Sequence, residues 1–183
     1  KTVKFQFNDV IFNGNTLFSE FELKKYAADY LGKEITFEDI QQITLKITEL
    51  YHDNGYLTST AYIPPQKIAN GRVCINIMEG KIGNIDINGA KWAKTSYIKN
   101  NILKSNGFKE ENIFNVNDLK KSMIDLNSND YLKGKATIQR GEKLETTDII
   151  LDIEDRIPVD LSVSWDNEGK EYIGIQKANI TLT

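Results

Sequence analysis

The sequence predicts an α+β fold, with two tandem copies of a small β-α-α-β-β domain and a third, all-β segment. We place the first domain at residues 1–80, the second at residues 81–156 and the all-β segment at residues 157–183. Three observations support this prediction: an internal repeat, paired helix-start signals in each copy, and a change to strict alternation of apolar and polar residues near residue 158.

An internal repeat relates the two copies. Asn13-Gly14 recurs as Asn88-Gly89, which lies 75 positions later. The same spacing relates further positions, namely Gly32, Asn54, Tyr56, Leu57, Ala61 and Ile63 to Gly107, Asn129, Tyr131, Leu132, Ala136 and Ile138. Between these anchors the spacing changes to 79, so that Asp39-Ile40 matches Asp118-Leu119. The second copy therefore has four more residues between its helices and four fewer in its second helix. Four residues are about one helical turn, which keeps the same helix face inward.

Two helices are expected between the first and second strands of the first copy. Ser19 and Glu22 form a capping box that predicts a helix start, and Gly32 is a typical residue after a helix end. Thr36 and Asp39 repeat this spacing at the start of a second helix. The expected core-facing stripes are Leu23, Tyr26, Ala27 and Tyr30 on the first helix, and Ile40, Thr44, Ile47 and Tyr51 on the second.

Three strands complete the first copy. The first lies within residues 3–17, around Phe5, Phe7, Val10 and Phe12. The second covers residues 58–63 and is stopped by Pro64-Pro65, and the third alternates at Val73, Ile75 and Ile77. The second copy repeats this order. Its first strand carries Ile82, Ile85 and Ile87, and its first helix carries Ile98 and Ile102. Its second helix is capped by Asn115 and carries Leu119, Met123 and Leu126, and its last two strands lie at residues 136–139 and around Ile149, Leu151 and Ile153.

In each copy we expect a three-stranded mixed sheet with both helices on one face, because this arrangement buries the apolar side of each layer. The last two strands form a hairpin and the helices cross over between the first two. The strand order is therefore 1-3-2, which leaves the second strand at an edge.

The all-β segment alternates strictly. Val159, Leu161, Val163 and Trp165 share one parity, and the pattern continues past a turn at residues 167–169 with Tyr172 and Gly174. Such strands are typical of a membrane β-barrel, while an ordinary soluble hairpin is the alternative and the better supported one on this segment alone. We expect the chain to be a fragment, and residues 158–183 to be disordered or paired with another chain or a neighbouring sheet edge.

Composition argues for a binding module and against an enzyme. The net charge is −3 and the pI about 5.3, which disfavours nucleic-acid binding, and residues 31–34 hold one glycine where a KH domain needs two. We interpret the single histidine, His52, as a solvated surface residue, and Glu79 as part of a cap or a solvated face. The single cysteine, Cys74, is expected on a half-buried strand. No metal site, cofactor or catalytic set is expected.

The chain resembles the periplasmic half of two-partner secretion transporters, the TpsB-type outer-membrane proteins that secrete haemolysins and adhesins. The matching stretches are residues 12–18, 51–56, 61–66 and 71–80 in the first copy, and residues 85–89, 119–126 and 147–151 in the second. The first copy is similar to the first of the family's two POTRA domains. The motif that carries this similarity is Gly55-Tyr56, followed by Ala-x-Ile-Pro-x-Gln from Ala61 and by Glu79-Gly80. The resemblance implies that the all-β segment is the first hairpin of the membrane barrel.

The resemblance further implies a role at the periplasmic face of the Gram-negative outer membrane. The two domains would capture an unfolded exoprotein, an adhesin or a haemolysin, through its N-terminal secretion domain and deliver it to the barrel pore. A POTRA scaffold of a barrel-assembly or cell-division complex is the alternative.

We expect an extended client to pair with the edge strand of the first domain, because such an edge offers unpaired N–H and C=O groups. A proline at Ala61 or Tyr62 should then obstruct pairing. Leu45, an apolar residue on the outward face of the second helix, would line a shallow groove beside the strand, although isolated surface leucines are also normal. The expected client-binding residues are Leu45, Thr58, Ser59, Thr60, Ala61, Tyr62 and Ile63.

Overall fold

The computed structural model describes residues 4–157, 161–166 and 177–182, and only the backbone of the last two stretches. We call residues 1–80 the first repeat and residues 81–156 the second repeat. The first repeat contains β1 (Lys4–Phe7), β2 (Asp9–Asn13), α1 (Glu20–Lys24), the 3-10 turn η1 (Ala28–Tyr30), β3 (Lys33–Thr36), α2 (Phe37–Asp53), β4 (Thr60–Tyr62) and β5 (Arg72–Met78).

The main sheet of the first repeat has the order β2-β5-β4, with β2 parallel and β4 antiparallel to β5. This is the predicted mixed sheet of order 1-3-2. The expected single first strand is wrong, because it is divided at Asn8, whose N–H donates to the carbonyl of Gly71 over 2.8 Å. The piece before Asn8, β1, pairs antiparallel with β3, a four-residue strand that is too short to leave a pattern in the sequence.

The helices of the first repeat begin at the predicted residues. Ser19 with Glu22 and Thr36 with Asp39 both form complete capping boxes. The first helix is shorter than expected, since α1 ends at Lys24 and the chain continues through a 3-10 turn. On α2 all four expected residues are buried, and Ile43 joins them.

The second repeat contains β6 (Lys81–Asn88), α3 (Thr95–Tyr97), the π-helical turn η2 (Ile98–Leu103), the 3-10 turn η3 (Lys104–Asn106), α4 (Val116–Ser128), β7 (Leu132–Arg140) and β8 (Thr146–Asp155). Its sheet has the order β6-β8-β7, with β6 parallel and β7 antiparallel to β8. The first helix region is again irregular, yet Ile98 and Ile102 are buried as expected.

Each repeat has its own sheet and its own apolar core, the first around Tyr51 and the second around Leu126. The repeated Asn-Gly pair has a steric explanation. Gly14 and Gly89 both have φ values near +80°, and a Cβ at either position would lie 2.2 or 2.3 Å from the carbonyl oxygen of Ile77 or Ile153. Only glycine fits so close to the last strand.

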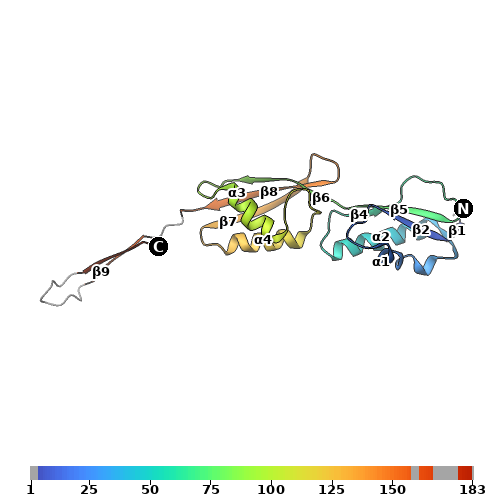
Figure 1. The fold of residues 1–183 in the computed structure, drawn as a ribbon, viewed down its shortest axis with the longest axis horizontal. Coiled ribbons are helices and arrows are strands. Elements are labelled where there is room, and N and C mark those ends of the chain that lie inside the picture. The colour runs from blue at the N-terminus through green and yellow to red at the C-terminus, as the bar shows by residue number, and fades with distance from the viewer. Residues whose placement is uncertain (1–3, 158–160, 167–176, 183) are drawn as a thin grey trace.

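The two repeats lie end to end (Figure 1), with the residues that directly follow α2 against the start of α4. The N–H of Val116 donates to the carbonyl of Gly55 over 2.9 Å, and the Asn115 amide donates to the carbonyl of Asn54 over 3.1 Å. We call this contact the joint. The carbonyl end of one helix thus meets the amide end of the next, so that unsatisfied groups of both helix termini are paired.

Beyond the second repeat, β9 (Leu161–Asp166) and β10 (Lys177–Leu182) pair antiparallel with one another. The expectation that these residues would be disordered or would pair with another chain or sheet edge is wrong for the two strands. The expected turn at residues 167–169, with Tyr172 and Gly174, lies outside the described residues. Among the helices that the structure describes, none has both the length and the apolar character to span a membrane.

Candidate strand-binding site

The second strand of each main sheet is an edge, as predicted, but the first edge is short. β4 covers three residues and not the six expected from residue 58 to residue 63. Before it, the Ser59 N–H closes a turn onto the carbonyl of Tyr56 over 3.0 Å, and the buried Ser59 hydroxyl accepts from Gly80 N–H. After it, Pro64 has no N–H to continue the ladder.

Helix α2 already occupies the outward side of the first edge. In an antiparallel pair the N–H and C=O groups of alternate residues point away from the partner strand. Ala61 is such an outward residue, and its N–H donates to the Thr48 hydroxyl over 2.9 Å. The carbonyl of Ser59 lies 3.1 Å from the Nε2 atom of His52. His52 is exposed, as expected, but it also contacts the strand edge.

The other expected site residues are divided between faces. Leu45 is 51% exposed and lies one turn before Thr48 on α2, beside the edge. Ile63 is half-buried next to a cavity of about 320 Å³ that Phe37 and Pro64 also line. The side chain of Tyr62 is exposed. Because Tyr62 directly follows the outward residue Ala61, its N–H points the other way and belongs to the hydrogen-bond ladder with β5. Tyr62→Pro would therefore damage the sheet itself, so it is not a suitable probe of the edge.

The second edge is longer and more open. β7 has nine residues, and the side-chain amide of Asn127 on α4 pairs with both backbone groups of Gly134, over 2.9 and 3.1 Å. Gly134 is thus an outward residue, and by alternation Ala136 and Ile138 are outward too. No hydrogen bond from the described residues reaches the outward N–H and C=O groups of Ala136 and Ile138.

The difference between the two edges follows from helix length. α2 has 17 residues and α4 has 13, as the change in repeat spacing predicted. Thr48 and Asn127 occupy equivalent positions on the two helices. Thr48 reaches Ala61 and the additional turn brings His52 to Ser59, whereas α4 ends just after Asn127 has paired with Gly134.

An apolar groove runs beside the open edge. It has a volume of about 750 Å³ and is lined by Leu119, Lys120, Met123, Ile124, Asn127, Gly134, Lys135, Ala136 and Thr137. Ile124 is 67% exposed and Ile138 47%. We call this cavity the β7–α4 groove. Sequence reasoning missed Ile124, although the spacing of 79 that relates the helices makes it the counterpart of Leu45.

A buried carboxylate holds the loop after β2 in place beside the first sheet. Glu79 is buried, and accepts hydrogen bonds from the N–H groups of Thr16 and Leu17 and from the hydroxyls of Thr16 and Tyr51. The interpretation of Glu79 as a cap or solvated residue is therefore wrong. Burial acts to raise the pKa of Glu79, but these hydrogen bonds outweigh it and hold the pKa below the ordinary value. Burial and the neighbouring carboxylate raise the pKa of Tyr51.

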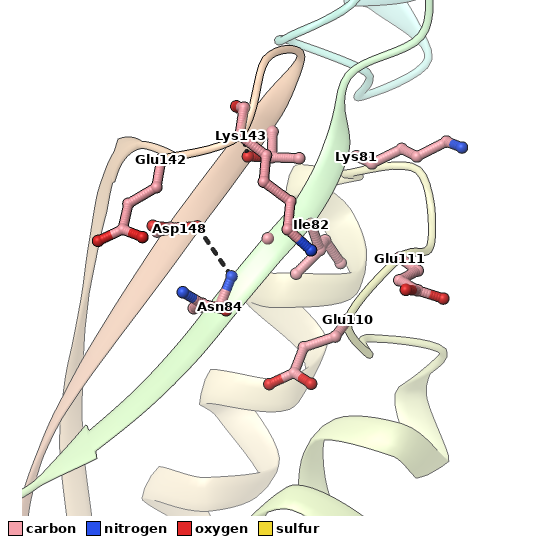
Figure 2. A pocket seen from close by; sticks show the side chains of 10 residues that line it. Lys81, Ile82, Asn84, Glu110, Glu111, Glu142, Lys143 and Asp148 are labelled. Carbon is pink, nitrogen blue, oxygen red and sulfur yellow. Dashed lines mark hydrogen bonds between the residues drawn. The ribbon is translucent and has the colours of Figure 1, made fainter.

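A polar cavity of about 670 Å³ lies elsewhere, at the β-bulge between Ile82 and Ile85 in β6 (Figure 2). The buried carboxylate of Asp148 accepts from the N–H of Asn84 over 2.8 Å. The carboxylates of Glu110 and Glu142 spread to different sides of β6 and do not converge. Among the described residues, no group of three or more His, Cys, Asp or Glu is placed to hold a metal ion. The cavity is explained by the bulge.

Comparison with known proteins agrees with these features. Residues 5–80 match the POTRA domain family of the ShlB type. The heme/hemopexin transporter protein HuxB of Haemophilus influenzae is 26% identical over 153 residues, which cover 84% of this chain and 27% of HuxB. The outer membrane transporter CdiB of Dickeya dadantii is 25% identical over 180 residues, which cover 97% of this chain and 31% of CdiB.

The chain therefore spans less than a third of the length of these two relatives. The solved structure of CdiB from Escherichia coli superimposes with a TM-score of 0.74 at 21% identity, over 100% of this chain and 33% of that one, which confirms the predicted fold class. Both sequence relatives are transporters, in agreement with the prediction that this chain is not an enzyme. Residues 5–80 are thus a POTRA domain of the ShlB type, and the resemblance of the chain to the two-partner secretion transporters is confirmed.

Proposed function

We propose that this chain is the periplasmic part of an outer-membrane protein transporter, and that it recognises an unfolded exoprotein through its secretion domain and delivers it to a membrane-embedded barrel that begins with β9. The names of both relatives support a role in transport, and that of CdiB supports the outer membrane as its place. The observation that carries the recognition step is the open edge of β7, with the apolar β7–α4 groove beside it.

The edge and the groove together select an extended, amphipathic strand. Backbone bonds to Ala136 and Ile138 require an extended chain and place little demand on its sequence. In a bound strand every second side chain points to the same face, and these side chains would enter the groove next to Ile124 and Met123. Lys120 and Lys135 also line the groove, which favours acidic residues on the client near its apolar positions.

The first edge, Thr58 to Ile63 with Leu45, remains part of the proposal in a weaker role. A client that pairs with Ala61 must first displace the Thr48 hydroxyl, and one that pairs with Ser59 must displace His52. Exchanging one hydrogen bond for another yields little net free energy. The second edge needs no such exchange at Ala136 or Ile138, so we expect it to bind the client first.

The test is a titration of a fluorescently labelled exoprotein secretion domain, kept unfolded in mild urea, against the chain and matched variants. Ala136→Pro removes an outward N–H and leaves the ladder to β8 intact. We expect it to weaken binding by about 1–3 kcal/mol, the scale of one or two unmade hydrogen bonds. Ile124→Asp should weaken binding similarly, because it places a charge in the groove.

The matched controls are Ala61→Pro and Leu45→Asp in the first repeat, and circular dichroism confirms that each variant is folded. We expect both controls to have smaller effects than their counterparts. Equal effects in the two repeats would show that both edges bind the client. If folded Ala136→Pro and Ile124→Asp variants bind as tightly as the unchanged chain, the open edge is not the recognition site.

A further inference from the structure

Exposed aromatic side chains line one cavity of the second repeat, together with residues just before the chain passes to β9. Trp92 is 61% exposed and Tyr97 46%. With Tyr131, Lys94 and Arg156 they line a mainly apolar cavity of about 340 Å³. We call these five residues the aromatic patch. A large exposed tryptophan beside other aromatic residues marks an interaction surface more often than a solvated loop.

The patch is held rigidly by the backbone beneath it. The Asp155 carboxylate accepts hydrogen bonds from the N–H groups of Lys91, Trp92 and Ala93, over 2.6 to 3.0 Å. The Arg156 guanidinium lies 5.4 Å from the centre of the Tyr131 ring and donates to the carbonyl of Asp130. The backbone of the loop that carries Trp92 is therefore held in place, so that binding does not have to order it.

The fold of the repeat does not require this patch. In the first repeat, Leu17 and Tyr56 occupy the positions of Trp92 and Tyr131, and both are half-buried against their own core. That end of the first repeat is also covered at the joint, where Asn54 and Gly55 contact Asn115 and Val116. The equivalent end of the second repeat carries the larger and more exposed Trp92 in place of Leu17, as expected of a surface that binds a partner of its own.

We propose that the aromatic patch binds the headgroup region of a lipid bilayer that contains anionic lipid. Tryptophan and tyrosine favour the membrane interface because one end of each ring is apolar and the other polar. Lys94 and Arg156 line the cavity with the rings and are exposed, as is Lys91 directly before Trp92, and they supply cations for lipid phosphates. The carboxylate of Asp155 is turned to the loop amides, whose N–H groups partly screen its negative charge.

The length of the segment after Arg156 agrees with a lipid bilayer as the partner of the patch. The inference rests on the proposed function, in which β9 enters the outer membrane. Leu161, the first residue of β9, lies five residues after Arg156, so that the two are at most roughly 18 Å apart even in a fully extended chain. The polar interface of a bilayer is about 5–8 Å deep on each side. A tether of this length keeps the patch within reach of the lipid headgroups.

The test uses the fluorescence of Trp92 in the full chain. Trp165→Phe leaves Trp92 as the single tryptophan, and Trp92→Phe leaves Trp165 as a separate reporter on β9. Each variant is mixed with vesicles of phosphatidylethanolamine and phosphatidylglycerol, and with vesicles of phosphatidylcholine alone. With the anionic vesicles, we expect the Trp92 emission to shift to shorter wavelength and to be quenched by brominated lipid. We expect this binding to weaken at high salt.

Charge reversal identifies the patch as the source of the signal. Lys94→Glu should weaken the vesicle affinity reported by Trp92 by at least about fivefold, which is the effect of losing one cation near an anionic surface. The loss should exceed this value because the substitution also reverses the charge. Lys67→Glu, on an exposed loop of the first repeat, is the matched control and should have no effect.

Two results would overturn the inference. In one, Trp165 responds to vesicles while Trp92 does not, which would mean that the strands bind lipid and the patch stays in water. In the other, Trp92 shifts with protein concentration in the absence of lipid, which would make the patch a contact between copies of the chain. Neither result affects the client titration, so the failure of this inference is distinguishable from the failure of the proposed function.

Discussion

Replacing Glu79 by glutamine should remove a large part of the stability of the first repeat. Oε1 of Glu79 accepts from Thr16 N–H at 2.8 Å, Leu17 N–H at 3.0 Å and the Tyr51 hydroxyl at 2.8 Å, while Oε2 accepts from the Thr16 hydroxyl. A glutamine offers one oxygen and one NH₂ group, so the Thr16 hydroxyl loses its acceptor and the other three bonds lose their charge.

The magnitude follows from these contacts. A hydrogen bond to a charged group contributes about 1.5–3 kcal/mol and a neutral one about 0.5–1.5 kcal/mol, so each of the three weakened bonds loses roughly 1 kcal/mol. With the lost Thr16 hydroxyl bond in addition, we expect Glu79→Gln to lower the free energy of unfolding by at least about 3 kcal/mol, out of the roughly 5–15 kcal/mol typical of a domain. Tyr51→Phe removes one donor only and should lower it by about 1–2 kcal/mol.

The dependence on pH provides a second, independent check. The pKa of Glu79 in the folded chain lies below its ordinary value of 4.5. The ionised carboxylate therefore stabilises the fold fully above that ordinary value, and this contribution is lost as the pH falls through the lower folded pKa. The difference in stability between the unchanged chain and Glu79→Gln should be largest at neutral pH and should shrink below about pH 4.5.

The assay is urea unfolding followed by far-ultraviolet circular dichroism at pH 7 and pH 3.5. Both tryptophans lie outside the first repeat, so their fluorescence reports separately on the rest of the chain. Asp155→Asn is the matched change in the second repeat, where the hydrogen bond from Ala93, followed by those from Lys91 and Trp92, lowers the pKa of the carboxyl. A loss smaller than about 0.5 kcal/mol at pH 7, or a loss independent of pH, would refute the reasoning.

Three further changes test other features of the fold. Gly89→Ala should lower the free energy of unfolding by about 1–3 kcal/mol, because the alanine would have to adopt a positive φ and its Cβ would meet the Ile153 carbonyl. Urea unfolding followed by Trp92 fluorescence measures this loss. Gly55→Ala should loosen the joint, because its Cβ would lie 2.5 Å from the Asn117 amide, and should separate the unfolding of the two repeats into distinct transitions in a calorimeter. Deleting residues 158–183 should leave the melting temperature of the repeats nearly unchanged, and a large drop would show that these residues belong to the second core.

Local signals made much of the fold predictable. The capping boxes at Ser19 and Thr36 were confirmed because a helix start depends on residues three positions apart. The 1-3-2 strand order was confirmed because a hairpin and a two-helix crossover allow few other arrangements. The repeat also predicted that α4 is four residues shorter than α2, which the structure confirms. The domain boundaries at residues 80 and 156 stay a prediction.

The sequence alone could not show which edge is open. That depends on whether a side chain on one element reaches the backbone of another, as Thr48 reaches Ala61 across 13 positions. The same limit applies to Glu79, whose burial is decided by the approach of the loop at Thr16 and of Tyr51 on α2. The sequence by itself determined the elements, their order and the repeat, since these rest on neighbours along the chain. Only the tertiary structure decided the partners of each polar group, since they come from residues that folding brings together.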